Sequence, residues 1–226
     1  PDLRLVLSTT AIDHPLVHFH PWGCSYHDIG KTFSPVSPAN VAEVMARKTR
    51  FCCFVVSNGQ SEVRNALFAQ LDWHQRVDSA GKALNNMPGG ERAPGAIDDA
   101  LPHGANLAFI EWLRQDRFVI CCENQSSPGY HTEKITNAYL AHAVPVYWGA
   151  PSIDALHDPA SMVYLEGMQD IPRVVDRVLG LDASPDRYRE MLLTTPFRVP
   201  PASLASPYNH RAHTQAIARV LAEIVL

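Results

Sequence analysis

The sequence lacks several features that would each point to a familiar class of protein. No apolar run approaches the roughly 20 residues that a membrane-spanning helix needs, and the 226 residues carry a formal net charge of -4. A slightly acidic chain has no general attraction for nucleic acids or anionic membranes. Any recognition of phosphate must therefore come from a few local side chains.

Common catalytic motifs are absent as well. The sequence contains no G-x-G-x-x-G, G-x-x-x-x-G-K-[ST], G-x-S-x-G or H-E-x-x-H, which argues against the commonest dehydrogenases, P-loop NTPases, hydrolases and zinc proteases. Cysteine is scarce, and four of the five cysteines are adjacent pairs in apolar runs, at 52–53 and 121–122. Neighbouring strand residues point to opposite faces, so such pairs are poor disulfides and poor metal ligands. They predict buried free thiols in a reducing compartment.

What is present is the composition of a globular protein, with 46% hydrophobic and 19% charged residues. Short apolar runs alternate with segments of helical period, which predicts an α/β fold built on a parallel sheet. The run 51–56 is apolar throughout, as in strands covered on both faces. Strands are expected at 3–7, 51–57, 117–122, 144–147 and 162–165, and helices at 38–47, 61–73, 105–114, 132–143, 171–179, 186–193 and 214–225.

Two cations stand in the first turns of helices that follow predicted strands, Arg64 and Lys134. A cation in the first turn is repelled by the positive end of the helix dipole, which costs about 0.3–1 kcal/mol of stability unless an anion binds there. Both would face the carboxyl edge of the sheet, where ligands bind. One interpretation is a clamp for a diphosphate. The alternative is that both are solvated helix residues, with Arg64 paired to Glu62 or Asp72. Thr132 or His131 is expected to cap the second helix.

One segment resembles the donor-binding signature of the alpha-1,3/1,4-fucosyltransferases of glycosyltransferase family 10. It reads C-C-E-N-Q-S-S-P-G-Y-H-T-E-K-I-T-N-A-Y at 121–139 and continues with V-P-V-Y-W-G at 144–149. Upstream segments are similar to the preceding motifs of that family in the same order: F-V-V-S-N at 54–58, V-R-N at 63–65, V-D-S-A-G-K at 77–82 and N-N at 85–86. The resemblance extends from about residue 51 to about residue 167.

The resemblance implies a two-lobed GT-B enzyme that transfers L-fucose from GDP-fucose, with inversion, to an oligosaccharide containing N-acetylglucosamine. A Rossmann-like C-terminal lobe would hold the nucleotide sugar, and an N-terminal lobe the acceptor. By resemblance, Arg64 and Lys134 bind the diphosphate and stabilise the leaving group, Glu133 binds the ribose or donor hydroxyls, and Asn124 and Tyr130 bind the donor. No cofactor or obligatory metal is expected, because two fixed cations can replace a divalent ion.

Two positions depart from the family pattern. Gln125 replaces the usual serine, and His131 stands where a small apolar residue is usual. The role of His131 is left open between a group titrating beside the donor and a packed residue. The family's proposed base is a glutamate of the N-terminal lobe, and no base is assigned in this sequence.

The length is more than one average domain and less than two. We expect residues 38–226 to form the GDP-sugar-binding domain, and residues 1–37 to be a remnant of the acceptor lobe and the interlobe loop. Because the chain starts at Pro1 without a methionine, we expect an upstream segment to be missing. The expected location is the cytoplasm of a bacterium, with peripheral membrane contact through the missing terminus. The Golgi lumen is the alternative if the full-length chain carries an N-terminal anchor.

Other functions stay open on these residues. The chain could be a GT-B transferase for another nucleotide sugar, or a non-catalytic nucleotide-sugar-binding module. A metal site at the clustered histidines is not expected, because Pro15 and Pro21 interrupt any helix that would align them; the histidines are His14, His18, His20 and His27.

Overall fold

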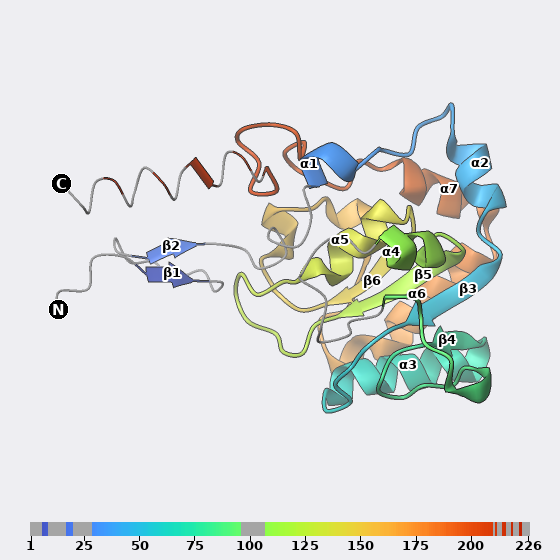
Figure 1. Cartoon of the computed structure of the whole chain (residues 1–226). Coiled ribbons are helices and arrows are strands. Elements are labelled where there is room, and N and C mark those ends of the chain that lie inside the picture. Colours follow the sequence, from blue (N-terminus) through green and yellow to red (C-terminus); the bar gives the residue numbers. More distant parts are fainter. Residues whose placement is uncertain are drawn as a thin grey trace.

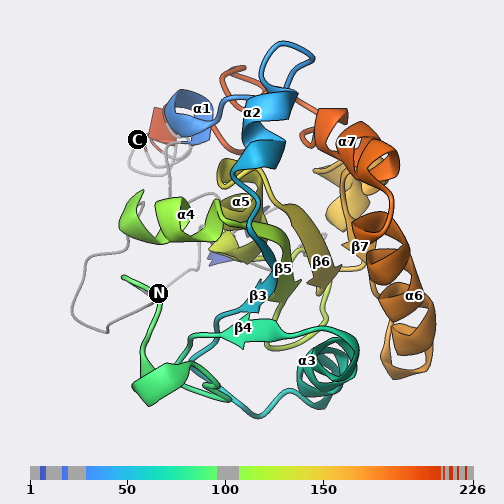
Figure 2. The ribbon, with the colours of Figure 1, turned by 90° about the vertical axis from the view of Figure 1, so that its right-hand side faces the viewer.

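A computed structural model describes residues 6–8, 17–19, 29–95 and 107–209, and five single positions near the end of the chain: Arg211, Thr214, Gln215, Ala218 and Ala222. Its centre is a parallel sheet in the order β4-β3-β5-β6-β7 (Figure 1 and Figure 2). The strands are β3 (Arg50–Phe54), β4 (Val77–Ser79), β5 (Asp116–Cys122), β6 (Val144–Trp148) and β7 (Val163–Tyr164). The predicted α/β fold with a parallel sheet is confirmed.

The strand order creates a switch point between β3 and β5. From β3 the chain moves outward to β4, whereas from β5 it moves the other way to β6 and β7. The two central strands are in register, with Cys52 beside Phe118 and Cys53 beside Val119. Loops leaving the carboxyl ends of these strands diverge, which opens the crevice where ligands of such folds bind.

Helices cover both faces of the sheet (Figure 2). On one face lie α2 (Val41–Ala46), α3 (Glu62–His74), α6 (Ile171–Asp182) and α7 (Pro185–Leu193). On the other lie α1 (Ile29–Thr32), α4 (Leu107–Leu113) and α5 (Glu133–Leu140). Short 3-10 turns, named η2 to η5, occupy Pro88–Gly90, Ile153–Ala155, Pro159–Ser161 and Met168–Asp170.

Strand residues alternate between the two hydrophobic cores. Cys52 and Phe118 pack on the core with α3 and α6, while Cys53 and Val119 pack on the core with α4 and α5. This explains the uninterrupted apolar runs, since both faces are covered. The cysteines at 52, 53, 121 and 122 are buried and free, as predicted; Cys24 lies outside the described residues.

Several element boundaries differ from the predicted ones. Strand β4 was not predicted, because three residues that include Asp78 give no clear alternation. Helix α5 ends at Leu140 rather than 143, because His142 adopts a left-handed φ of 53° that a helix cannot continue through. Of the helix predicted at 214–225, the described positions are helical: Thr214, Gln215, Ala218 and Ala222.

Near the start of the chain, β1 (Val6–Ser8) and β2 (Val17–Phe19) form a separate two-stranded parallel sheet. Within the described ranges no helix is long and apolar enough to cross a membrane. Nor do these ranges hold a group of metal-ligating side chains. His14, His20 and His27 and the side chain of His18 lie outside what the structure describes.

Candidate functional site

Arg64 joins the two loops that leave the switch point. Its side chain is 0% exposed, although it sits in the first turn of α3. One guanidinium nitrogen, Nη1, donates to Oδ1 of Asn124 at 2.9 Å, and Nη2 donates to the carbonyl of Asn58. The alternative of a solvated Arg64 paired with Glu62 or Asp72 is therefore wrong. The long side chain of Arg64 points inward because both loops offer oxygen acceptors to its guanidinium group.

Arg64 keeps hydrogen-bonding capacity that these two contacts do not use. Its Nε is buried and has no hydrogen-bond partner in the described part of the chain. Burial lowers the pKa of Arg64, while the nearby Glu123 opposes that shift. A buried cation with an unmet donor gains more from an anionic ligand than a solvated one does.

Lys134, the second cation, is held by a buried carboxylate. Glu123 is 0% exposed and accepts from Nζ of Lys134 at 2.9 Å. Its oxygens also accept from the Thr132 amide at 2.7 Å and from the Thr132 hydroxyl. Thr132 occupies the N-cap position of α5, as predicted, but its side chain makes no capping hydrogen bond to the helix. Its hydroxyl binds the acid instead.

The loop after β5 is anchored on the loop after β6. Ser126 Oγ donates to the carbonyl of Gly149 at 2.8 Å, and the Gly129 amide donates to Oγ of Ser152 at 3.2 Å. A Cβ at Gly149 would lie 2.4 Å from the Tyr147 hydroxyl and 2.7 Å from Cγ of Glu123. The glycine in the V-P-V-Y-W-G motif thus makes room for the acid that holds Lys134.

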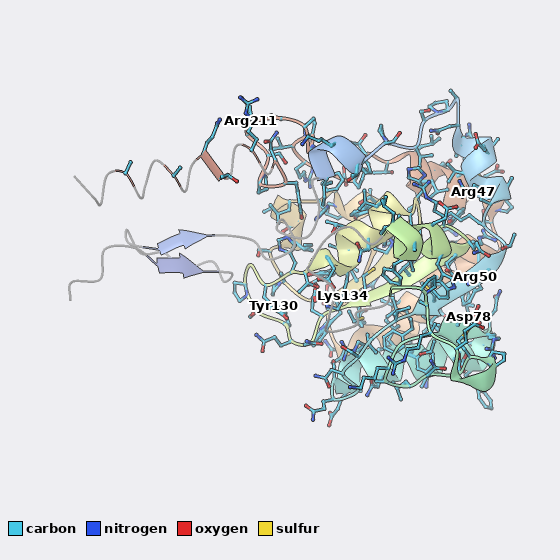
Figure 3. All side chains as sticks on the ribbon, in the orientation of Figure 1. Arg47, Arg50, Asp78, Tyr130, Lys134 and Arg211 are labelled. Carbon is cyan, nitrogen blue, oxygen red and sulfur yellow. The ribbon has the colours of Figure 1, made fainter. Side chains whose placement is uncertain are left out.

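Tyr130 and Glu133, both half-buried, flank Lys134. The Tyr130 amide donates to the carbonyl of Ser127 at 3.1 Å. Burial and then the charge of Glu123 raise the pKa of Tyr130. Figure 3 shows Tyr130 and Lys134 toward one end of the sheet and Arg47 and Arg50 toward the other. The five predicted positions lie in the loops and first helical turns that follow the carboxyl ends of β3 and β5, here called the switch-point edge, where Arg64 and Asn124 bond directly.

His131 is a packed residue. It is 0% exposed, its Nδ1 lies 3.3 Å from the Gly129 carbonyl, and its Nε2 lies 3.1 Å from the Tyr208 hydroxyl. Burial lowers the pKa of His131 to about 4, so it stays neutral near pH 7. Of the two open roles, the structure favours the packed one.

The segment at 77–86 shapes the site from its edge. A Cβ at Gly81 would lie 2.2 Å from the Val56 carbonyl oxygen, so only glycine lets this loop close onto the end of β3. Asn86 accepts from the Ser79 amide and donates to the Val77 carbonyl, both at 2.9 Å. Its amide thus supplies hydrogen bonds that the edge strand β4 lacks on its outer side.

Cations at the opposite end of the sheet have local partners. Lys48 Nζ donates to the Ala141 carbonyl at the end of α5 at 2.9 Å, and Arg50 pairs with Asp116 at 2.5 Å. Arg47 pairs with Glu111. The two arginines complement carboxylates, whereas burial lowers the pKa of Lys48 to about 7.

Glu123 was missed from the sequence. It directly precedes Asn124 and follows the last residue of the apolar strand β5, and an acid directly after a strand buried on both faces is the signal that could have identified it. The burial of Glu123 depends on Thr132, nine residues further along the chain, which bonds its oxygens, and on Gly149 after β6, which leaves room for its side chain.

The sequence is similar to a family of known proteins. The family model for the C-terminal part of glycosyltransferase family 10 (fucosyltransferase) matches residues 45–193. The alpha-(1,3)-fucosyltransferase FucT of Helicobacter pylori is 31% identical over 150 residues, which cover 66% of this chain and 28% of that protein. A putative fucosyltransferase of Acanthamoeba polyphaga mimivirus is 25% identical over 158 residues, or 68% of this chain and 25% of that protein.

A crystal structure of an alpha1,3-fucosyltransferase with GDP-fucose has a similar fold. It superposes with a TM-score of 0.66 at 22% identity, covering 88% of this chain and 64% of that one. At this identity the likeness shows the fold, which is of the GT-B type. The chain spans about a quarter of the length of the two curated relatives.

Proposed function

The chain belongs to glycosyltransferase family 10, and from that premise we propose that it binds GDP-fucose at the switch-point edge. Acting with an acceptor lobe, it transfers L-fucose with inversion to an oligosaccharide containing N-acetylglucosamine, forming an alpha-1,3 or alpha-1,4 linkage. The observation that carries this proposal is the convergence of Arg64 and Lys134 from two adjacent βα units on one crevice.

Transfer breaks the bond between fucose C1 and the β-phosphate oxygen of GDP. Electrons of that bond move to the departing oxygen, positive charge builds on the sugar ring, and the acceptor hydroxyl oxygen forms the new bond to C1 from the opposite face. Arg64 and Lys134 bind the diphosphate and stabilise the charge that develops on it, as fixed donors do in other sites. They supply the stabilisation that a divalent metal gives in other transferases, so no cofactor is proposed.

The other site residues complete the donor contacts. Asn124, fixed by Arg64, and Tyr130 bind the donor sugar, and Glu133 binds the ribose or donor hydroxyls. A carboxylate base outside the residues assigned here would take the proton of the acceptor hydroxyl. We assign residues 38–226 to the donor domain and residues 1–37 to a remnant of the acceptor lobe. Four buried free thiols support a cytoplasmic location.

Calorimetry with GDP tests the proposal. We expect binding to wild type and about 10-fold to 100-fold weaker binding to Arg64→Ala and Lys134→Ala, since one charge-assisted hydrogen bond is worth about 1.5–3 kcal/mol. Arg47→Ala is the matched control, because that exposed arginine pairs with Glu111 toward the opposite end of the sheet (Figure 3). Absence of GDP binding, or equal binding by all variants, contradicts the proposal.

Donor choice needs a separate measurement. Thermal unfolding with GDP, ADP, UDP and CDP, and with GDP-fucose and GDP-mannose, ranks the ligands by the stability they add. We expect GDP-fucose and GDP to give the largest shifts. A larger shift with another nucleotide would indicate a transferase for a different donor. Binding without transfer by the complete protein would indicate a binding module.

A further inference from the structure

Glu123 sits where a carboxylate is costly to bury. Its backbone amide still donates to the Trp148 carbonyl at 2.8 Å, so β5 and β6 fix its position at the end of the ladder. The side chain is fully buried, and Gly149 lets its Cγ pass. A buried acid is retained in such a place only when its oxygens are fully used.

Both oxygens are used by two residues. Oε1 accepts from the Thr132 amide at 2.7 Å, and Oε2 accepts from Lys134 Nζ at 2.9 Å. The Thr132 hydroxyl lies 3.0 Å and 2.9 Å from the two oxygens. Thr132 has one hydroxyl proton, which it donates to Glu123, and its oxygen then accepts from Lys134 Nζ at 2.8 Å.

This arrangement sets the direction of the ammonium group. Two of the three Nζ protons of Lys134 go to Glu123 and Thr132. No third acceptor is found among the described residues, which leaves one N–H available for a ligand. The stem of a lysine is flexible, so two acceptors at fixed positions are needed to aim that proton.

The same acid controls the charge of Lys134. Burial lowers the pKa of Lys134, but the charge of Glu123, then that of Glu133 and the hydrogen bond that Lys134 donates to Glu123, outweigh burial and raise it. Tyr130 is the remaining titratable group that acts on it in the same direction. Removing Glu123 would leave burial opposed chiefly by Glu133.

We propose that Glu123 and Thr132 are positioning residues that hold Lys134 protonated and direct one of its N–H groups at the donor diphosphate. This inference rests on the proposed function and adds to it a buried acid that does not touch the ligand. The negative charge of Glu123 weakens the pull of Lys134 on an anion, so its presence is explained by orientation and protonation rather than by attraction.

Glu123→Gln tests the inference through a pH profile. GDP affinity is measured by calorimetry from pH 7 to pH 10 for wild type and variant. We expect the alkaline loss of affinity to move down by about one pH unit or more, the size expected when one charge-assisted hydrogen bond to Lys134 is lost. Titration of the guanine base affects both proteins equally and cancels in the difference.

Asp116→Asn is the matched control. Asp116 is, like Glu123, a fully buried carboxylate; it is the first residue of β5, whereas Glu123 follows the last, and it pairs with Arg50. We expect this variant to change stability without moving the alkaline limb of GDP binding. A shift as large as that of Glu123→Gln would show that an acid buried at either end of β5 has the effect, and would overturn the inference.

Thr132→Val keeps the proposal testable if Glu123→Gln does not fold. It removes the hydroxyl but retains the charge of Glu123, so we expect about tenfold weaker GDP binding at pH 7 with a smaller shift of the alkaline limb. If wild type fails to bind GDP, the proposed function fails. If wild type binds, Lys134→Ala weakens binding and the Glu123 and Thr132 variants match wild type, only the present inference is overturned.

Discussion

At the scale of single residues, Gly149 matters to the site because it has no side chain. Gly149 carries no reactive group, yet its missing side chain allows Glu123 and the Tyr147 hydroxyl to meet beside it. The Tyr147 hydroxyl also accepts from the Ala150 amide at 3.0 Å, so the ring has little freedom to withdraw. The position of Glu123, and through it that of Lys134, therefore depends on a glycine at 149.

Gly149→Ala is expected to destabilise the fold by about 1–3 kcal/mol, the usual cost of forcing extra volume into a packed position. It should also weaken GDP binding, because displacing Glu123 displaces Lys134. Denaturant unfolding and calorimetry measure the two effects. Gly59→Ala is the control, since an added methyl there meets only the Ala83 Cβ at an ordinary 3.5 Å. Equal stability of the two variants would contradict the packing argument.

The sequence revealed the charged residues of the site more readily than their supports. Arg64, Asn124 and Lys134 were predicted from motifs and from their places after strands. That Arg64 is buried was not predicted, because its partners, Asn58 and Asn124, come from two loops brought together by the fold. Glu123 was missed because its hydrogen bonds to Thr132 and Lys134 depend on how the loop between β5 and α5 folds back, which motif spacing does not show.

At the scale of elements, three aromatic and imidazole rings tie the loop after β5 to the C-terminal segment. The Tyr208 hydroxyl lies 3.1 Å from His131 Nε2 and 2.7 Å from His157 Nε2. The three rings are buried. Since the Gly129 carbonyl can only accept, His131 donates from Nδ1 and accepts from Tyr208 at Nε2. Residues far apart in sequence thus fix the conformation of the donor loop.

This link should make the protein sensitive to acid. Burial lowers the pKa of His131 to about 4 and that of His157 to about 3, from an ordinary value of 6.5. Below pH 6.5 the unfolded chain binds protons that the folded chain excludes, so stability falls as the pH drops from 6.5 toward 4. For His131 alone the loss over that window is about 3 kcal/mol.

His131→Ala should flatten this part of the profile. Denaturant unfolding at several pH values from 4 to 7 measures the slope, and Tyr208→Phe serves as the companion variant because it keeps both histidines buried. We expect Tyr208→Phe to be less stable at pH 7 by about 1–3 kcal/mol, the cost of leaving hydrogen-bonding groups unmet. A wild-type slope retained in His131→Ala would show that other groups cause the acid sensitivity.

Elements covered on both faces were predictable, and those shaped by side-chain contacts were not. Strands β3, β5 and β6 can be recognised in the sequence as apolar runs, because helices cover both of their faces. Strand β4 is short and borrows hydrogen bonds from Asn86, which no periodicity shows. Helix α5 ends early because His142 adopts a left-handed conformation. The sequence does not indicate this, because residues other than glycine rarely adopt that conformation.

For the whole molecule, the order of the strands is what brings the two cations together. Arg64 follows β3, on the side of the sheet that continues to β4, and Lys134 follows β5, on the side that continues to β6 and β7. Strand order is a long-range property that periodicity does not contain. A ligand held by both cations would therefore bridge the two halves of the sheet.

Hydrogen exchange with and without GDP tests this bridging. At 100 times its dissociation constant GDP adds about 2.7 kcal/mol to global stability. Beyond that general effect, we expect the amides of 55–64 and 123–134 to gain the most protection, while the opposite end of the sheet around Lys48 gains none. Lys134→Ala should retain protection at 55–64 and lose it at 123–134. Protection confined to one loop in wild type would mean that the ligand contacts one half of the sheet only, and the two-cation clamp would be wrong.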